Sequence, residues 1–118
     1  MVAAGLAVQG AYYVLTGMWP LVSMRTFEAV TGPKVDDWLV HMVGLLAAVI
    51  GAVLLAASRS GRLTHEILAL SAGAAAGFAA IDLRYGVVGR ISPIYLADAA
   101  VELAFLAIAG LAWRDRPR

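Results

Sequence analysis

The sequence predicts an all-α integral membrane protein, a bundle of four transmembrane helices joined by short loops. Hydrophobic residues make up 62% of the 118 residues and charged residues only 14%, whereas soluble domains average about 45–50% and about 25%. Four stretches are apolar over the roughly 17–25 residues that a transmembrane helix needs. Only short polar segments separate them, so the whole chain is expected to form one membrane domain.

The four expected spans run over about residues 2–22, 38–57, 67–85 and 94–113. The first contains no Lys, Arg, Asp or Glu and lacks the positively charged start of a signal peptide, so we interpret it as a mature span. Ser92-Pro93 is a typical helix start, because Ser caps a helix and Pro is tolerated at its first position. The amphipathic pattern of residues 20–30 predicts either a short interfacial helix or a packed connecting turn.

The Lys and Arg residues predict the orientation in the membrane. One side carries a compact basic turn and a basic tail, and acidic residues dilute the basic residues of the other side. Because cytoplasmic loops carry an excess of Lys and Arg, both ends of the chain are expected in the cytoplasm. The high content of Ala, Gly, Val and Arg is typical of GC-rich bacterial genomes, so the expected location is the bacterial plasma (inner) membrane.

The composition excludes several function classes. It argues against a soluble enzyme of ordinary type, and a net charge of +1 leaves no basic surplus for nucleic acid. Without cysteine there is no disulfide, no thiolate nucleophile and no cysteine-ligated zinc or iron–sulfur cluster. The sequence contains no nucleotide-binding, serine-hydrolase or zinc-protease motif, so neither a cofactor nor a metal ion is expected.

Small residues are expected to hold the helices together, because lipid tails are as apolar as leucine and burial alone cannot do so. Gly73 and Gly77 form a GxxxG pair in the third span. The other small-residue stripes comprise Ala72, Ala76 and Ala80, then Gly44, Ala48, Ala52 and Ala56, then Ala3, Ala7 and Ala11, and then Ala100 and Ala104. We interpret these stripes as packing within the bundle, with homo-oligomerisation through one of them as the alternative.

Ionisable side chains at membrane depth carry most of the functional information. Each costs roughly 2.5–3.5 kcal/mol on insertion scales, so it survives where it is paired or faces a cavity. At the helical rise, Asp98 lies about 7 Å and Glu102 about 13 Å below Pro93. The two acids are four residues apart and therefore share one face of their helix.

Matching depths on the other helices predict an outward-open polar pocket. His41 and Asp82 reach the depth of Asp98, and a tyrosine of the first span reaches that of Glu102. Arg84 lies near the mouth, where it is placed to neutralise an acid. The pocket candidates are His41, Asp82, Asp98, Glu102, Tyr12, Tyr13 and Arg84. The competing interpretation is a buried hydrogen-bonded network that fixes helix register, with Glu102 protonated, because two neighbouring carboxyls in a low dielectric tend not to ionise together.

Three functions follow from these two interpretations. The leading expectation is a non-enzymatic protein, either an accessory or assembly subunit of a larger membrane complex or a binder of a lipid-like ligand. The alternative is transport of protons, cations or small molecules through a pocket centred on Asp98 and Glu102. The third is a membrane-embedded enzyme that uses His41 and Glu102 as base and acid.

The expected partners are the lipid bilayer, together with larger membrane-protein subunits or further copies of the chain. No nucleic acid is expected. In span number and loop lengths the layout is similar to DoxX-like and related small four-helix bacterial membrane proteins. This resemblance is architectural and implies the fold, but no activity and no site residue.

Overall fold

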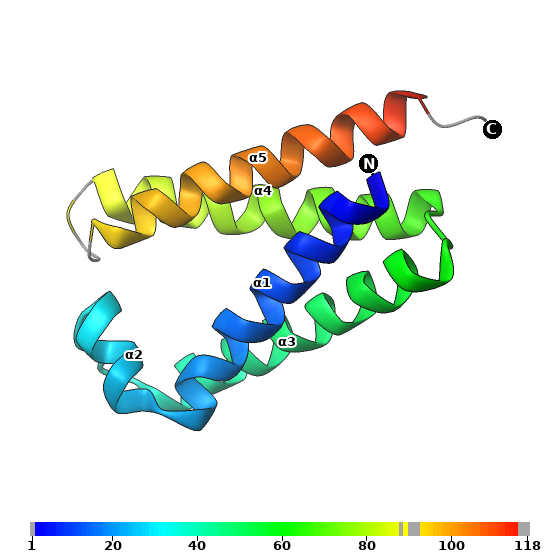
Figure 1. Cartoon of the computed structure of the whole chain (residues 1–118). Helices are drawn as coiled ribbons and strands as arrows, with labels where there is room; N and C mark the ends of the chain where they lie inside the picture. The colour runs from blue at the N-terminus through cyan, green and yellow to red at the C-terminus, as the bar shows by residue number, and fades with distance from the viewer. Residues whose placement is uncertain (1, 88, 90–92, 116–118) are drawn as a thin grey trace.

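The computed structural model describes residues 2–87, 89 and 93–115, which form five helices (Figure 1). They are α1 (Val2–Val22), α2 (Met24–Thr31), α3 (Asp37–Ser60), α4 (His65–Val87) and α5 (Ile94–Asp115). The prediction of an all-helical chain is confirmed, and the segment after the first expected span forms a short helix, α2. The expected cap at Ser92 lies outside the described residues.

Three of these helices are long and apolar enough to cross a membrane, namely α3, α4 and α5 as far as Arg114. Between 22% and 28% of the most apolar stretch of each is buried inside the protein, so most of these side chains face outward. So large an apolar surface is suited to lipid and not to water, which indicates a membrane protein. α1 has the expected bounds but lies outside this set.

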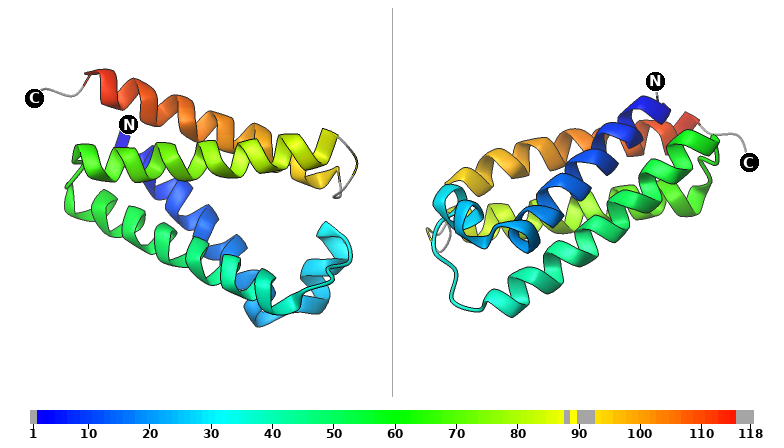
Figure 2. Two further views of the ribbon diagram at one scale, coloured as in Figure 1. Left: turned by 180° about the vertical axis from the view of Figure 1, so that it is seen from behind. Right: turned by 60° about the horizontal axis from the view of Figure 1, so that its bottom comes forward.

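The four long helices pack as two pairs, α1 with α3 and α4 with α5 (Figure 2). The pairs meet near the turn between α3 and α4 and splay apart toward the opposite end (Figures 1 and 2). We call the first of these the turn end and the second, where α2 lies, the α2 end. The start of α1 and the end of α5 both lie at the turn end (Figure 1), as expected for four helices that alternate in direction.

Glycines bring α1 and α3 into backbone contact. A Cβ atom built on Gly17 would lie 2.4 Å from the carbonyl oxygen of Gly44, and one on Gly51 would lie 2.5 Å from that of Gly10. No side chain fits at such distances, so the two helices approach as closely as their backbones allow. We call these four residues the glycine seam. Close packing of this kind holds helices together where lipid replaces water.

The small-residue stripes expected on α4 and α5 do not form the interface within the chain. A Cβ atom on Gly73 or Gly77 would meet nothing within 4 Å. α4 instead buries Ser71, Ala75 and Ala79, a stripe on another face of the same helix. The expectation that the GxxxG pair packs inside the bundle is therefore wrong, because four-residue spacing marks a face without showing which face meets a neighbour. The same holds for Ala100 and Ala104, which are exposed.

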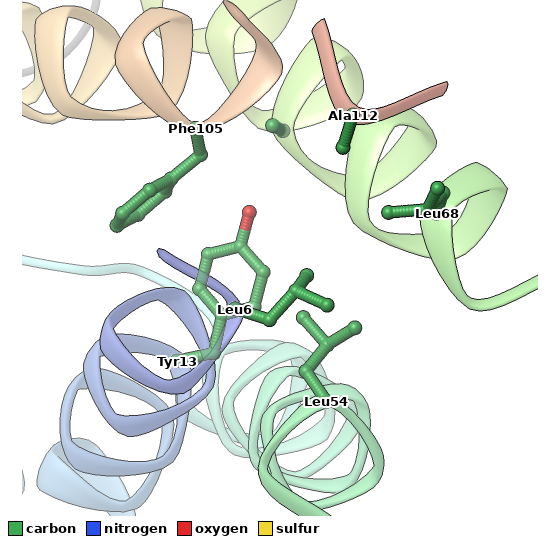
Figure 3. Close-up of a cluster of buried hydrophobic side chains, with 7 residues drawn as sticks. Leu6, Tyr13, Leu54, Leu68, Phe105 and Ala112 are labelled. Carbon is green, nitrogen blue, oxygen red and sulfur yellow. The ribbon is translucent and has the colours of Figure 1, made fainter. Parts of the chain in front are cut away.

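An apolar plug closes the turn end of the bundle. It consists of Leu6, Leu54, Leu68 and Ala112, one residue from each long helix (Figure 3). The three leucines are at most 1% exposed. Tyr13 lies beside them, and its hydroxyl points away from α1 toward the α4 and α5 pair (Figure 3). The plug separates the turn end from the polar groups that lie deeper in the bundle.

Candidate functional site

Three carboxyl groups and two tyrosines meet between the helix pairs. The Tyr12 hydroxyl donates a hydrogen bond to Oδ1 of Asp98, and the Tyr13 hydroxyl donates to Oε1 of Glu102 at 2.5 Å. The carboxyl of Asp98 lies within hydrogen-bonding reach of the carboxyls of Asp82 in α4 and of Glu102. We call these five residues the acidic cluster. Its contacts join α1 to α5 and α5 to α4, so it links the two helix pairs.

Apolar groups surround much of the acidic cluster. Glu102 is 2% exposed and Asp82 is 6% exposed, whereas Asp98 is only partly buried. The ring of Phe105 lies 5.7 Å from that of Tyr12 and 6.1 Å from that of Tyr13 in edge contacts. Phe78 packs on Tyr13 from α4, with ring centres 5.3 Å apart. Asp82 and Glu102 are therefore removed from water, and Asp98 is the most accessible of the three acids.

One atom of the cluster lacks a partner. Oδ2 of Asp82 is buried, and no N–H or O–H group of the described residues donates to it. A pair of ionised carboxylates offers acceptors only, so the contact between Asp82 and Asp98 becomes a hydrogen bond when one of them carries a proton. Two facing carboxylates in apolar surroundings disfavour each other's charge. The geometry therefore favours a proton held between Asp82 and Asp98.

Gln9 and Ser71 extend the polar groups toward the turn end. Nε2 of Gln9 donates to the Tyr13 hydroxyl at 3.2 Å and to the carbonyl oxygen of Ser71 at 3.1 Å. In return, the Ser71 hydroxyl donates to Oε1 of Gln9. Along α4, Ser71 and Asp82 are about 16 Å apart at the helical rise, roughly half of the hydrocarbon thickness of a bilayer. The polar groups thus cover half the depth of a membrane and stop at the apolar plug.

Two of the seven residues that the sequence singled out lie outside the acidic cluster. His41 is partly buried in the second turn of α3. The start of this helix lies at the α2 end, where the helix pairs splay apart (Figure 2). Among the described residues the His41 side chain makes no hydrogen bond or ion pair. Arg84 is exposed on the last turn of α4 and forms no ion pair with a described acid. It lies only two residues from Asp82, a spacing that places the two side chains on different faces of the helix.

The structure also adds residues to those that the sequence singled out. Ser71 was not predicted, because a single hydroxyl in an apolar span does not indicate a functional site. Lys34 follows α2 directly and contacts both α2 and α5. A Lys just beyond a helix end commonly binds the last carbonyl groups, and that signal was present in the sequence. In the part of the chain that the structure describes, no group of three or more His, Asp or Glu side chains is arranged to hold a metal ion.

Comparisons with models of protein families, with curated proteins and with solved structures find no match. We therefore infer the function from the acidic cluster and its surroundings.

Proposed function

We propose that this chain is a four-span protein of the bacterial plasma membrane that binds and moves protons through the acidic cluster. In this proposal α1 is the additional span. Its 21 residues reach about 31 Å at the helical rise, enough for a hydrocarbon core of about 30 Å. It carries no charged residue and packs along α3 through the glycine seam. The turn end, with both ends of the chain, faces the cytoplasm.

The observation that carries this proposal is the buried Asp82 carboxyl, which faces Asp98 and has no donor for Oδ2. A network that only fixes helix register is expected to satisfy its buried polar atoms, because each unsatisfied atom costs stability. A site that takes up and releases a proton must instead leave a position that the proton fills. An ionisable group of this kind at membrane depth commonly marks a proton pathway.

The packing around the acids favours the transport alternative over the other expected functions. Tyr12, Tyr13 and Phe105 fill the space beside the carboxyls with their own rings. A proton binds in a site packed in this way, whereas a lipid-like ligand requires the rings to move aside. An acid–base enzyme loses its expected base, because His41 belongs to the start of α3, the end of this helix that diverges from α4 and α5 (Figure 2).

Proton movement is tested with the purified protein in lipid vesicles that enclose a pH-sensitive dye. After a step in external pH, with potassium and valinomycin present to balance charge, we expect the wild type to equilibrate faster than protein-free vesicles. Asp82→Asn and Asp98→Asn are expected to lower the rate to that of protein-free vesicles. Glu66→Gln is the matched control, because Glu66 is an exposed acid in the first turn of α4. Equal rates for the wild type and the two Asn variants would favour an accessory role and overturn the proposal.

The membrane topology is tested with single cysteines, since the natural chain has none. We introduce Ser60→Cys at the turn end, Val35→Cys at the α2 end and Ala4→Cys at the start of α1, all at exposed positions. In intact bacterial cells, a membrane-impermeant maleimide is expected to label only the Val35→Cys variant. Labelling of Ala4→Cys together with Val35→Cys would show that α1 does not cross the membrane.

A further inference from the structure

The route by which a proton reaches the acidic cluster follows from what lies at each end of the bundle. At the turn end, the apolar plug separates the cluster from water. At the α2 end the helix pairs splay apart, and α2 lies between the end of α1 and the start of α5 (Figures 1 and 2). Asp98, the most accessible acid, is also the one nearest to the start of α5. The α2 end is therefore the open side from which protons reach the cluster, whereas a proton that crosses to the turn end must also pass the apolar plug.

Lys34 joins α2 to α5 at this end. Its ammonium group donates hydrogen bonds to the carbonyl oxygens of Thr31 at 3.0 Å and Gly32 at 2.8 Å, where α2 ends. The same group lies 5.5 Å from the ring centre of Phe27 in α2 and 5.2 Å from that of Tyr95 in α5. One cation thus contacts aromatic rings from both helices, each within the range of a cation–π contact.

The local sequence explains how Lys34 reaches this position. Gly32 has a φ of 97°, which side-chain-bearing residues rarely adopt, and this bend turns the chain back over the end of α2. The backbone N–H of Lys34 then donates to Oε2 of Glu28 at 2.8 Å. The bend at Gly32 and this hydrogen bond hold residue 34 against α2, and its side chain extends to α5.

The contact with Tyr95 places Lys34 close to the acidic cluster. Tyr95 precedes Asp98 by three residues, so the two side chains share a face of α5. Along the helix axis they are about 4.5 Å apart, less than one turn. Lys34 therefore lies over the face of α5 that leads to Asp98.

We propose that α2 is a gate over the acidic cluster and that Lys34 is the latch that holds it against α5. This inference rests on the proposed movement of protons. The rest of α2 is tied to α1, through the Trp19 ring, which packs on Phe27 at 5.4 Å and donates to the Thr26 hydroxyl at 2.9 Å. When the Lys34 contact breaks, α2 stays with the α1 and α3 pair, and the α4 and α5 pair separates from it at the α2 end.

The gate is tested with Lys34→Met in the vesicle assay. Methionine keeps the apolar length of the side chain but removes the ammonium, so we expect proton equilibration to become roughly fivefold faster, equivalent to about 1 kcal/mol of lost cation–π contact. Arg25→Met is the matched control, because Arg25 is a basic residue on the exposed face of α2. A rate for Lys34→Met equal to those of the wild type and of Arg25→Met would overturn the latch.

A second variant tests the gate with α2 fastened to α5. In Phe27→Cys with Tyr95→Cys, a short reducible thiol cross-linker joins the two helices at the position of the latch. We expect cross-linking to lower the rate below that of the wild type and reduction to raise it above the wild type. A rate that does not respond to the cross-linker would overturn the gate. If Asp82→Asn keeps the wild-type rate, the proposed function fails; if it abolishes the rate and Lys34→Met changes nothing, the latch alone fails.

Discussion

Replacing Gly51 by leucine is expected to separate α1 from α3 and to unfold the protein at a much lower temperature. A Cβ atom at this position would lie 2.5 Å from the carbonyl oxygen of Gly10 and 2.8 Å from the backbone nitrogen of Val14. Neither atom belongs to a flexible side chain, so the whole of α1 must move. Overpacking costs about 1–3 kcal/mol where side chains can adjust. We expect the free energy of unfolding to fall by at least about 3 kcal/mol, measured by thermal unfolding in detergent.

Gly77→Leu on α4 is the matched control for this prediction. A Cβ atom on Gly77 would meet nothing within 4 Å, and leucine is a better helix former than glycine by up to about 1 kcal/mol. We expect the unfolding temperature to stay the same or to rise slightly. A loss as large as that of Gly51→Leu would contradict the account of the glycine seam. It would indicate that Gly77 packs against another copy of the chain, the homo-oligomer considered from the sequence.

Asp82→Asn is expected to stabilise the protein while it abolishes proton movement. In the wild type the folded protein takes up a proton between Asp82 and Asp98, whereas an aspartate of the unfolded chain is ionised at neutral pH, so folding bears the free-energy cost of that proton. An asparagine amide donates an N–H group to Asp98 without taking up a proton, and since each pH unit is worth about 1.4 kcal/mol, we expect the free energy of unfolding to rise by about 1 kcal/mol or more. A destabilised Asp82→Asn variant would favour a structural network over a proton site.

Tyr13→Phe, in the same acidic cluster, is expected to destabilise the protein. It removes the hydroxyl that donates to Glu102 at 2.5 Å, and it leaves a carboxyl that is 2% exposed without this donor. Loss of one partner from a buried hydrogen bond costs about 1–3 kcal/mol. We therefore expect Tyr13→Phe to lower the unfolding temperature while Asp82→Asn raises it. Opposite shifts of the unfolding temperature would distinguish the carboxyl that has a donor from the one that lacks it.

Helix positions could be predicted from the sequence because apolar length and polar breaks determine them directly. Depth along each helix could also be predicted, since it follows from counting residues at a fixed rise. Tyr12, Tyr13 and Glu102 were placed at one level in this way, and the structure brings them together. Counting residues gives the position of a side chain only along the helix axis, and not its direction around the helix.

The direction in which a side chain points around its helix could not be predicted from depth alone. Arg84 has the depth expected for a partner of Asp82 but lies on another face of α4. His41 also has a suitable depth, yet α3 packs on α1 and diverges from the acids. For the same reason Gly73 and Gly77 appeared suited to packing, while the backbone contacts form at Gly17 and Gly51. Which helices pair is a tertiary property that a single sequence pattern does not show.

The contact of Lys34 with α5 could not be predicted from the sequence. Its role depends on the bend at Gly32 and on the approach of α2 to α5, two features that become apparent only when the helices are in place. From the sequence it counted as one basic residue among those that set the orientation. In the structure its ammonium group contacts the end of α2 and the ring of Tyr95 in α5.

The most direct test of the central claim, that the acidic cluster holds an exchangeable proton, is infrared difference spectroscopy of the protein in lipid. A protonated carboxyl group absorbs at a C=O stretching frequency that an ionised carboxylate lacks, and the band shifts in heavy water. We predict such a band at neutral pH, its loss in alkaline solution, and its disappearance in Asp82→Asn but not in Glu66→Gln. A wild-type protein without this band at neutral pH, or a band that Asp82→Asn leaves unchanged, would contradict the account.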